Sequence, residues 1–142
     1  MSQITRVEDM PIYGSVYQLA LKVEQCTREF PNDFRWLRGQ LLRSSESVPA
    51  NLTEGFYSQY STEYLQCLYR CRREAREAMT HLQYASDAQQ IESRKVVELL
   101  NKYENALKEL SSLIASIERK VRAHGKAKPN AVREELANYM AD

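Results

Sequence analysis

Few residues of this 142-residue chain are of the types that carry out catalytic or metal chemistry. Cys67 and Cys71 are four residues apart and would share one face of a helix, and His81 is one of only two histidines. Two thiolates without a second pair of ligands leave zinc under-coordinated, and no hydrolase, phosphate-loop or zinc-protease motif occurs. We interpret the three side chains as buried or partly buried packing residues. We therefore expect no enzymatic activity and no cofactor, the alternative being a metal-dependent bundle that uses these three residues.

Cationic side chains gather in two places and could bind nucleic acid. The first cluster comprises Arg70, Arg72, Arg73 and Arg76. The second comprises Arg119, Lys120, Arg122, Lys126, Lys128 and Arg133. Grouped arginines and lysines neutralise phosphates and bind RNA without sequence specificity. The structural alternative is that the second cluster complements a helix dipole, while the first cluster pairs with glutamates one helical turn away.

Four tyrosines near the first cluster have two possible roles. Tyr57, Tyr60, Tyr64 and Tyr69 could stack on the bases of a single strand. Tyrosines also line packed interfaces with the hydroxyl group at the rim, and we favour this second role.

Composition excludes several classes of protein. Twenty Lys and Arg against nineteen Asp and Glu give a net charge of +1, so any contact with nucleic acid must depend on a local patch. No stretch of 18 apolar residues predicts a membrane span, and the first nine residues do not resemble a signal peptide. Three cysteines in no C-x-x-C spacing argue against a disulfide scaffold. We expect a cytoplasmic protein with no membrane partner.

The elements that must position these residues are helices. Apolar spacing predicts helices over about residues 11–30, 34–55, 61–88 and 93–121, with Ser61 and Ser93 as N-caps. Pro49 lies inside the second pattern, and we expect it to kink that helix without ending it. Four such helices with short connections predict an all-α, antiparallel up-down-up-down four-helix bundle.

The bundle is expected to span residues 1–122. Residues 123–142 form a basic tail with Gly125 and Pro129, followed by a short extra helix at the C-terminus. That helix would carry Val132, Leu136, Tyr139 and Met140, and would pack on the bundle or on a neighbouring chain.

Two helices have more apolar residues than a single apolar stripe facing the core of the bundle would need. A wider apolar face needs a second partner surface, which predicts an oligomer. The extra residues are Tyr64, Cys67, Cys71, Ala78 and Ala85 in the third helix, and Leu99, Ala106 and Leu113 in the fourth. Identical contacts repeated head-to-tail around an axis would close into a ring.

The second helix contains a specific motif. The segment 40–56 reads QLLRSSESVPANLTEGF, and Glu63-Tyr64-Leu65 follows it. This segment resembles the signature of a four-helix-bundle family first noted in intervening sequences of bacterial 23S ribosomal RNA genes, and the resemblance covers about residues 10–122. The motif positions are Arg43, Ser47, Pro49, Ala50, Asn51, Glu54 and Gly55. Tyr60 stands where the family has a serine cap, and Arg73-Glu74 stand where it has a small Gly-Ser pair.

The resemblance implies a bundle without catalytic activity that assembles into a ring of five protomers. A related branch contains the accessory variability determinants of diversity-generating retroelements, which are basic pentamers that bind reverse transcriptase and RNA. We expect Asn51 to bond backbone freed by Pro49, and Glu54 to pair with Arg43 or with a neighbour's arginine. The function predicted is a homo-oligomeric adaptor in contact with RNA or a nucleic-acid enzyme. The alternative is an oligomer that recruits a protein and touches no nucleic acid.

Overall fold

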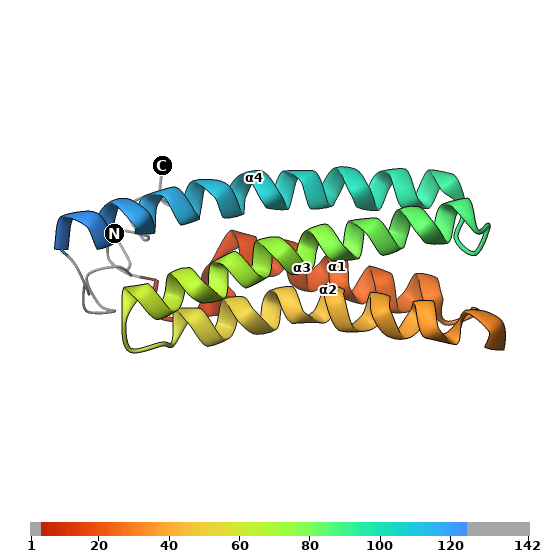
Figure 1. The fold of residues 1–142 in the computed structure, drawn as a ribbon, viewed down its shortest axis with the longest axis horizontal. Helices are drawn as coiled ribbons and strands as arrows, with labels where there is room; N and C mark the ends of the chain where they lie inside the picture. The colour runs from red at the N-terminus through yellow and green to blue at the C-terminus, as the bar shows by residue number, and fades with distance from the viewer. Residues whose placement is uncertain (1–3, 125–142) are drawn as a thin grey trace.

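The computed structural model describes residues 4–124 of the chain, which form an all-α, antiparallel up-down-up-down bundle (Figure 1). Its four long helices are α1 (Pro11–Thr27), α2 (Arg35–Phe56), α3 (Ser61–Asp87) and α4 (Ser93–His124). Short 3-10 helices, η1 (Val7–Asp9) and η2 (Asn32–Phe34), precede α1 and α2. The predicted fold is therefore confirmed, whereas the predicted extra C-terminal helix lies outside the described residues. Within residues 4–124, no helix is long and apolar enough to cross a membrane.

Two predicted helix ends are wrong. Helix α1 ends at Thr27 and not near residue 30, because the backbone turns at Phe30, whose amide donates to the Thr27 carbonyl, before the extended residue Pro31. Ser61 is not the N-cap of α3. The cap is Tyr60, in extended conformation and without a side-chain capping bond, while Ser61 is the buried first residue of the helix. Glu63 lies in the first turn of α3.

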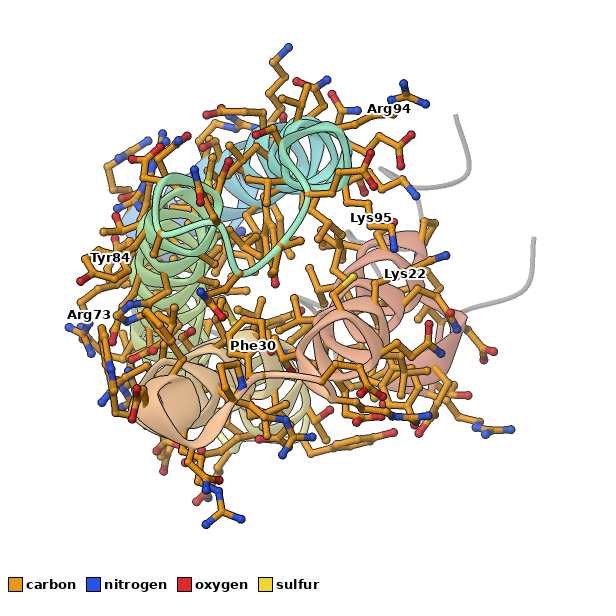
Figure 2. All side chains as sticks on the ribbon, turned by 90° about the vertical axis from the view of Figure 1, so that its right-hand side faces the viewer. Lys22, Phe30, Arg73, Tyr84, Arg94 and Lys95 are labelled. Carbon is orange, nitrogen blue, oxygen red and sulfur yellow. The ribbon has the colours of Figure 1, made fainter. Side chains whose placement is uncertain are left out.

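The apolar residues expected to be in excess are buried within one chain. Tyr64, Cys71, Ala78, Leu99 and Leu113 are all at most 4% exposed. Each helix of the bundle packs against two neighbours, α3 against α2 and α4, so its apolar face must be wider than a single stripe (Figure 2). The excess of apolar residues therefore does not support an oligomer, and any such support must come from other surfaces.

Helices α2 and α3 approach each other closely at Gly55. A Cβ atom at Gly55 would lie 2.7 Å from the Cβ of Cys67 and 3.0 Å from Cδ1 of Tyr64. Cys67 and Tyr64 are both buried and belong to the helix facing Gly55. A residue without a side chain is therefore needed for the observed separation of the two helices.

We predict that Gly55→Ala destabilises the fold by about 1–3 kcal/mol, the usual cost of forcing extra atoms into a packed core. Gly39→Ala is the matched control, because Gly39 is in the same helix and its Cβ would meet nothing within 4 Å. That control should stabilise the protein by about 0.5–1 kcal/mol through helix propensity. Urea unfolding measures both. Equal effects of the two substitutions would show that the contact at Gly55 is unimportant.

Candidate nucleic-acid interface

Pro49 is accommodated inside a continuous α2, as predicted. Its missing amide leaves the carbonyl of Ser45 without the usual helical donor. Asn51 does not reach that carbonyl. Its Nδ2 donates to the carbonyl of Ser47 over 2.8 Å, and its Oδ1 lies 3.5 Å from Nη1 of Arg70 on α3. Asn51 therefore links the proline-containing turn of α2 to α3. The prediction that Asn51 bonds the backbone freed by Pro49 is wrong, because its acceptor is the carbonyl of Ser47 and not that of Ser45.

Arg43 pairs with α3 and not with Glu54. Its guanidinium donates to Glu74 over 3.1 Å and also to Glu77. Burial would raise the pKa of Glu77, but the hydrogen bonds from Arg43 and His81 outweigh burial and hold that pKa below its ordinary value. Glu54 is exposed and forms no ion pair within residues 4–124. The predicted Arg43–Glu54 pair within one chain is therefore wrong.

The thiols and His81 have the structural roles predicted for them. Cys67 and Cys71 are buried, and the Cys71 Sγ lies 3.3 Å from the carbonyl of Val48, which accepts its hydrogen bond. Burial raises the pKa of Cys71 to about 12, so the thiolate needed for metal binding is disfavoured. His81 is half-buried beside Glu77, one turn earlier in α3. Within the described residues, no group of three potential metal ligands is found.

The first cationic cluster is divided between two surfaces. Arg70 turns toward Asn51 of α2 and also contacts the Sγ of Cys67 on its own helix. Arg72 lies over the ring of Tyr69, with Cζ 5.4 Å from the ring centroid. Arg76 approaches Glu104 of α4 at 3.5 Å, and Arg73 is exposed on the outside of the bundle (Figure 2). Within residues 4–124, none of these arginines forms an ion pair with a glutamate of its own helix, so the alternative in which they pair one helical turn away is wrong.

Tyr69 connects the first cluster with the second. Its hydroxyl donates to Glu118 of α4 over 2.7 Å, and this bond, with burial, raises the pKa of Tyr69. Arg72 and Arg122 act electrostatically on this pKa in the opposite direction, and Arg122 follows Glu118 by one turn of α4. Arg119 and Arg122 are exposed in the last turns of α4, where Lys120 is half-buried. Lys126, Lys128 and Arg133 lie outside the described residues.

The remaining tyrosines differ in exposure. Tyr64 is buried, with its hydroxyl 3.8 Å from Sδ of Met10. Tyr57 is 51% exposed, yet its hydroxyl accepts a hydrogen bond from the amide of Val7. Tyr60 is 37% exposed. The packing role is therefore confirmed for Tyr64 and Tyr69, whereas parts of the Tyr57 and Tyr60 rings are accessible.

Two surface features were not predicted. A groove of about 840 Å³ runs between α1 and α2, and the stacked rings of Tyr13 and Tyr17 line it. On the opposite side of the bundle from Arg73, Lys22 of α1 and Lys95 of α4 lie on facing helices (Figure 2). The four-residue spacing of Tyr13 and Tyr17 is visible in the sequence, but the meeting of Lys22 with Lys95 depends on which helices become neighbours.

We predict that Arg43→Gln lowers stability at pH 7 by about 1–2 kcal/mol, because it leaves the mostly buried carboxylate of Glu74 without its cation. The pKa of Glu77 is lowered in the fold. The ionised Glu77 carboxylate therefore stabilises the folded state at pH values above 4.5, its ordinary pKa. This stabilisation disappears as the pH falls through the lowered pKa of the folded state. The difference between wild type and variant should accordingly shrink in acid.

The control for this experiment is Arg76→Gln, which removes the exposed pair with Glu104. We expect a cost below about 0.5 kcal/mol at any pH, as for most surface ion pairs. Thermal unfolding of the three proteins between pH 7 and pH 3 measures the effect. A cost for Arg43→Gln that does not change with pH would contradict the ionic account.

Comparison with known proteins agrees with the fold and the motif. The chain matches the family model described as 23S rRNA-intervening sequence protein over residues 8–112. A solved structure from Bacteroides thetaiotaomicron, described as a protein of unknown function from the S23 ribosomal protein family, superposes with a TM-score of 0.67. The two are 21% identical, over 72% of this chain and 97% of the other, a level of identity that establishes likeness of fold. The comparison with curated proteins gives no match. Because the family model covers most of the bundle, this chain belongs to the family of 23S rRNA-intervening sequence proteins.

Proposed function

We propose that this protein is a non-enzymatic, homo-oligomeric adaptor that contacts RNA or a nucleic-acid enzyme such as a reverse transcriptase. The observation that carries the proposal is the contact of Arg72 with the ring of Tyr69, whose hydroxyl bonds to Glu118, one helical turn before Arg122 on α4. This contact joins the two cationic clusters into one surface. Neither arginine forms an ion pair within residues 4–124, and both are exposed. Cations that are not neutralised by their own chain are available to phosphates.

The chemistry of this surface favours backbone recognition. Arginine forms two parallel hydrogen bonds to a phosphate, and it also stacks on aromatic planes. The binding would be sensitive to salt and weakly specific for sequence, because phosphates are identical along the strand. An adaptor that holds RNA near an enzyme needs this kind of contact and no catalytic group of its own.

We predict that the double variant Arg72→Gln, Arg122→Gln weakens binding to a labelled single-stranded RNA. It should also flatten the dependence of log K on log salt, by about 0.7 for each lost phosphate contact. The control is Arg94→Gln, which removes a cation from the opposite end of α4. Fluorescence anisotropy at several salt concentrations measures both quantities. Equal affinity and slope in all three proteins would eliminate this surface and favour recruitment of a protein without nucleic acid.

Support for an oligomer comes from an exposed aromatic pair. Trp36 near the start of α2 and Tyr84 near the end of α3 contact each other edge to face, with ring centroids 5.4 Å apart. Trp36 is 51% exposed and Tyr84 is 50% exposed. Trp and Tyr are enriched at protein interfaces because a large rigid ring buries much surface at little entropic cost. We therefore assign this pair to the contact between protomers.

We predict that light scattering at low micromolar concentration gives a mass close to five times 16.5 kDa, the mass of one chain. The double variant Trp36→Ala, Tyr84→Ala should shift the mass toward that of one chain. The control is Val97→Ala, which truncates an exposed apolar residue of α4 and should leave the mass unchanged. A wild-type mass near 16.5 kDa would exclude the oligomer, and a stable dimer would exclude the ring.

A further inference from the structure

Two adjoining cavities lie between α1 and α4. The first has a volume of about 250 Å³, and Lys22, Lys95 and Lys102 are among the residues that line it. The second has a volume of about 350 Å³ and shares Lys22 and Lys102 with the first. Figure 2 shows the side chains of Lys22 and Lys95 together at the opening between the two helices. Because the two cavities share lining residues, they form one cleft, which we call the α1–α4 cleft.

The positive charge of the three lysines is not neutralised by the described part of the chain. None of them forms an ion pair within residues 4–124. Glu98 lines the first cavity three residues after Lys95 and four before Lys102, yet it pairs with neither. Lys95 also lies in the first turn of α4, where the helix dipole disfavours a cation. Three cations against one carboxylate create a positive potential, which the low-dielectric walls of a cleft concentrate.

The spacing of the lysines favours an anion with several charges in a row. Lys95 and Lys102 are seven residues apart, which is about 10 Å along a helix. Lys22 lines both cavities from the facing helix α1. A single phosphate would leave at least one ammonium group without a counter-charge, whereas linked phosphates can contact all three, and lysine is a common phosphate ligand. The first cavity therefore fits a diphosphate or triphosphate group.

The second cavity has a different lining and fits the group to which the phosphates are attached. Its uncharged lining comprises Ser15, Gln18 and Asn105 together with the buried residues Leu19 and Ala106. Amide side chains such as those of Gln18 and Asn105 donate to and accept from the edge of a nucleic-acid base, and apolar side chains pack against its face. Glu109 is the one carboxylate that lines this cavity, and it repels phosphates toward the first cavity.

We propose that the α1–α4 cleft binds a nucleoside diphosphate or triphosphate. The phosphates contact the three lysines, and the base contacts Gln18 and Asn105. Together the two cavities have a size usual for small-molecule sites, which is about 300–1,000 Å³. The inference is independent of the proposed function, because the cleft lies between α1 and α4 and requires neither RNA at the α3–α4 edge nor a contact between protomers.

The first experiment measures binding of ATP to the full chain by calorimetry without divalent metal. We expect the double variant Lys22→Gln, Lys102→Gln to weaken binding by about tenfold or more, because each lysine donates a charge-assisted hydrogen bond. The matched control is Arg35→Gln, Lys108→Gln, which removes two exposed cations that do not line the cleft and should leave the affinity unchanged. All four side chains are exposed, so both double variants should fold.

Two results of this experiment would overturn the proposal. One is the absence of ATP binding to the wild type, including the case in which the cleft variant loses affinity only for a labelled single-stranded RNA, which would assign the lysines to the backbone of a strand. The other is an equal loss of affinity in the two double variants, which would show only unspecific attraction between charges.

The second experiment tests the nucleoside with inorganic triphosphate as the probe. We expect ATP to bind the wild type about tenfold more tightly than inorganic triphosphate, because the base adds its own hydrogen bonds. In the variant Gln18→Leu, Asn105→Leu the two probes should bind equally. Equal affinities already in the wild type would overturn the assignment of a nucleotide.

Cys26 tests the position of the ligand. This residue lines the first cavity and is the one cysteine of the chain that is not buried. With ATP at about ten times its Kd, alkylation of Cys26 by iodoacetamide should slow about tenfold, because only the unoccupied fraction reacts. The variant Lys22→Gln, Lys102→Gln should show no such protection at the same ATP concentration. An unchanged rate in the wild type at saturating ATP would place the ligand elsewhere and overturn the proposal.

Discussion

The close contact between α2 and α3 is the constraint on which the rest of the structure depends. It is possible because Gly55 has no side chain where Cβ of Cys67 approaches. Along the same seam, the Cys71 thiol donates to the carbonyl of Val48, directly before the proline. Arg43 bonds to two carboxylates of α3 farther along. Because these contacts are distributed along the helices, they set the separation and the register of the two helices together.

This seam also decides which cations remain available. Arg70 faces α2 and is engaged by Asn51, so it contributes little to an external surface. Tyr69, Arg72 and Arg76 lie three and four residues apart and share the edge of α3 next to α4. Their partners there are Glu118 and Glu104. The cationic surface thus follows the α3–α4 edge, because the face of α3 that carries Arg70 is turned toward α2.

Most of the fold could be predicted from apolar periodicity, because four long amphipathic patterns with short connections permit few arrangements. The errors arose where a tertiary contact overrode a local preference. Ser61 is a good capping residue, yet it is buried as the first residue of the helix. Glu54 is eleven residues from Arg43 on the same helix, but Arg43 turns to α3, where Glu74 is more buried. Such pairings depend on the relative rotation of two helices, which no pattern within one helix specifies.

The family motif divides into two groups of residues once the contacts of its members are known. Arg43, Asn51 and Gly55 act between α2 and α3, and their residue types follow from charge pairing, amide hydrogen bonding and lack of space. Glu54 and Ala50 are exposed, and the fold does not require either residue type at its position. Ala50 lines the α1–α2 groove. One face of α2 therefore presents the motif residues that contact α3, and another face presents the motif residue that lines the groove. One helix can carry both sets because residues at different helical positions point to different faces.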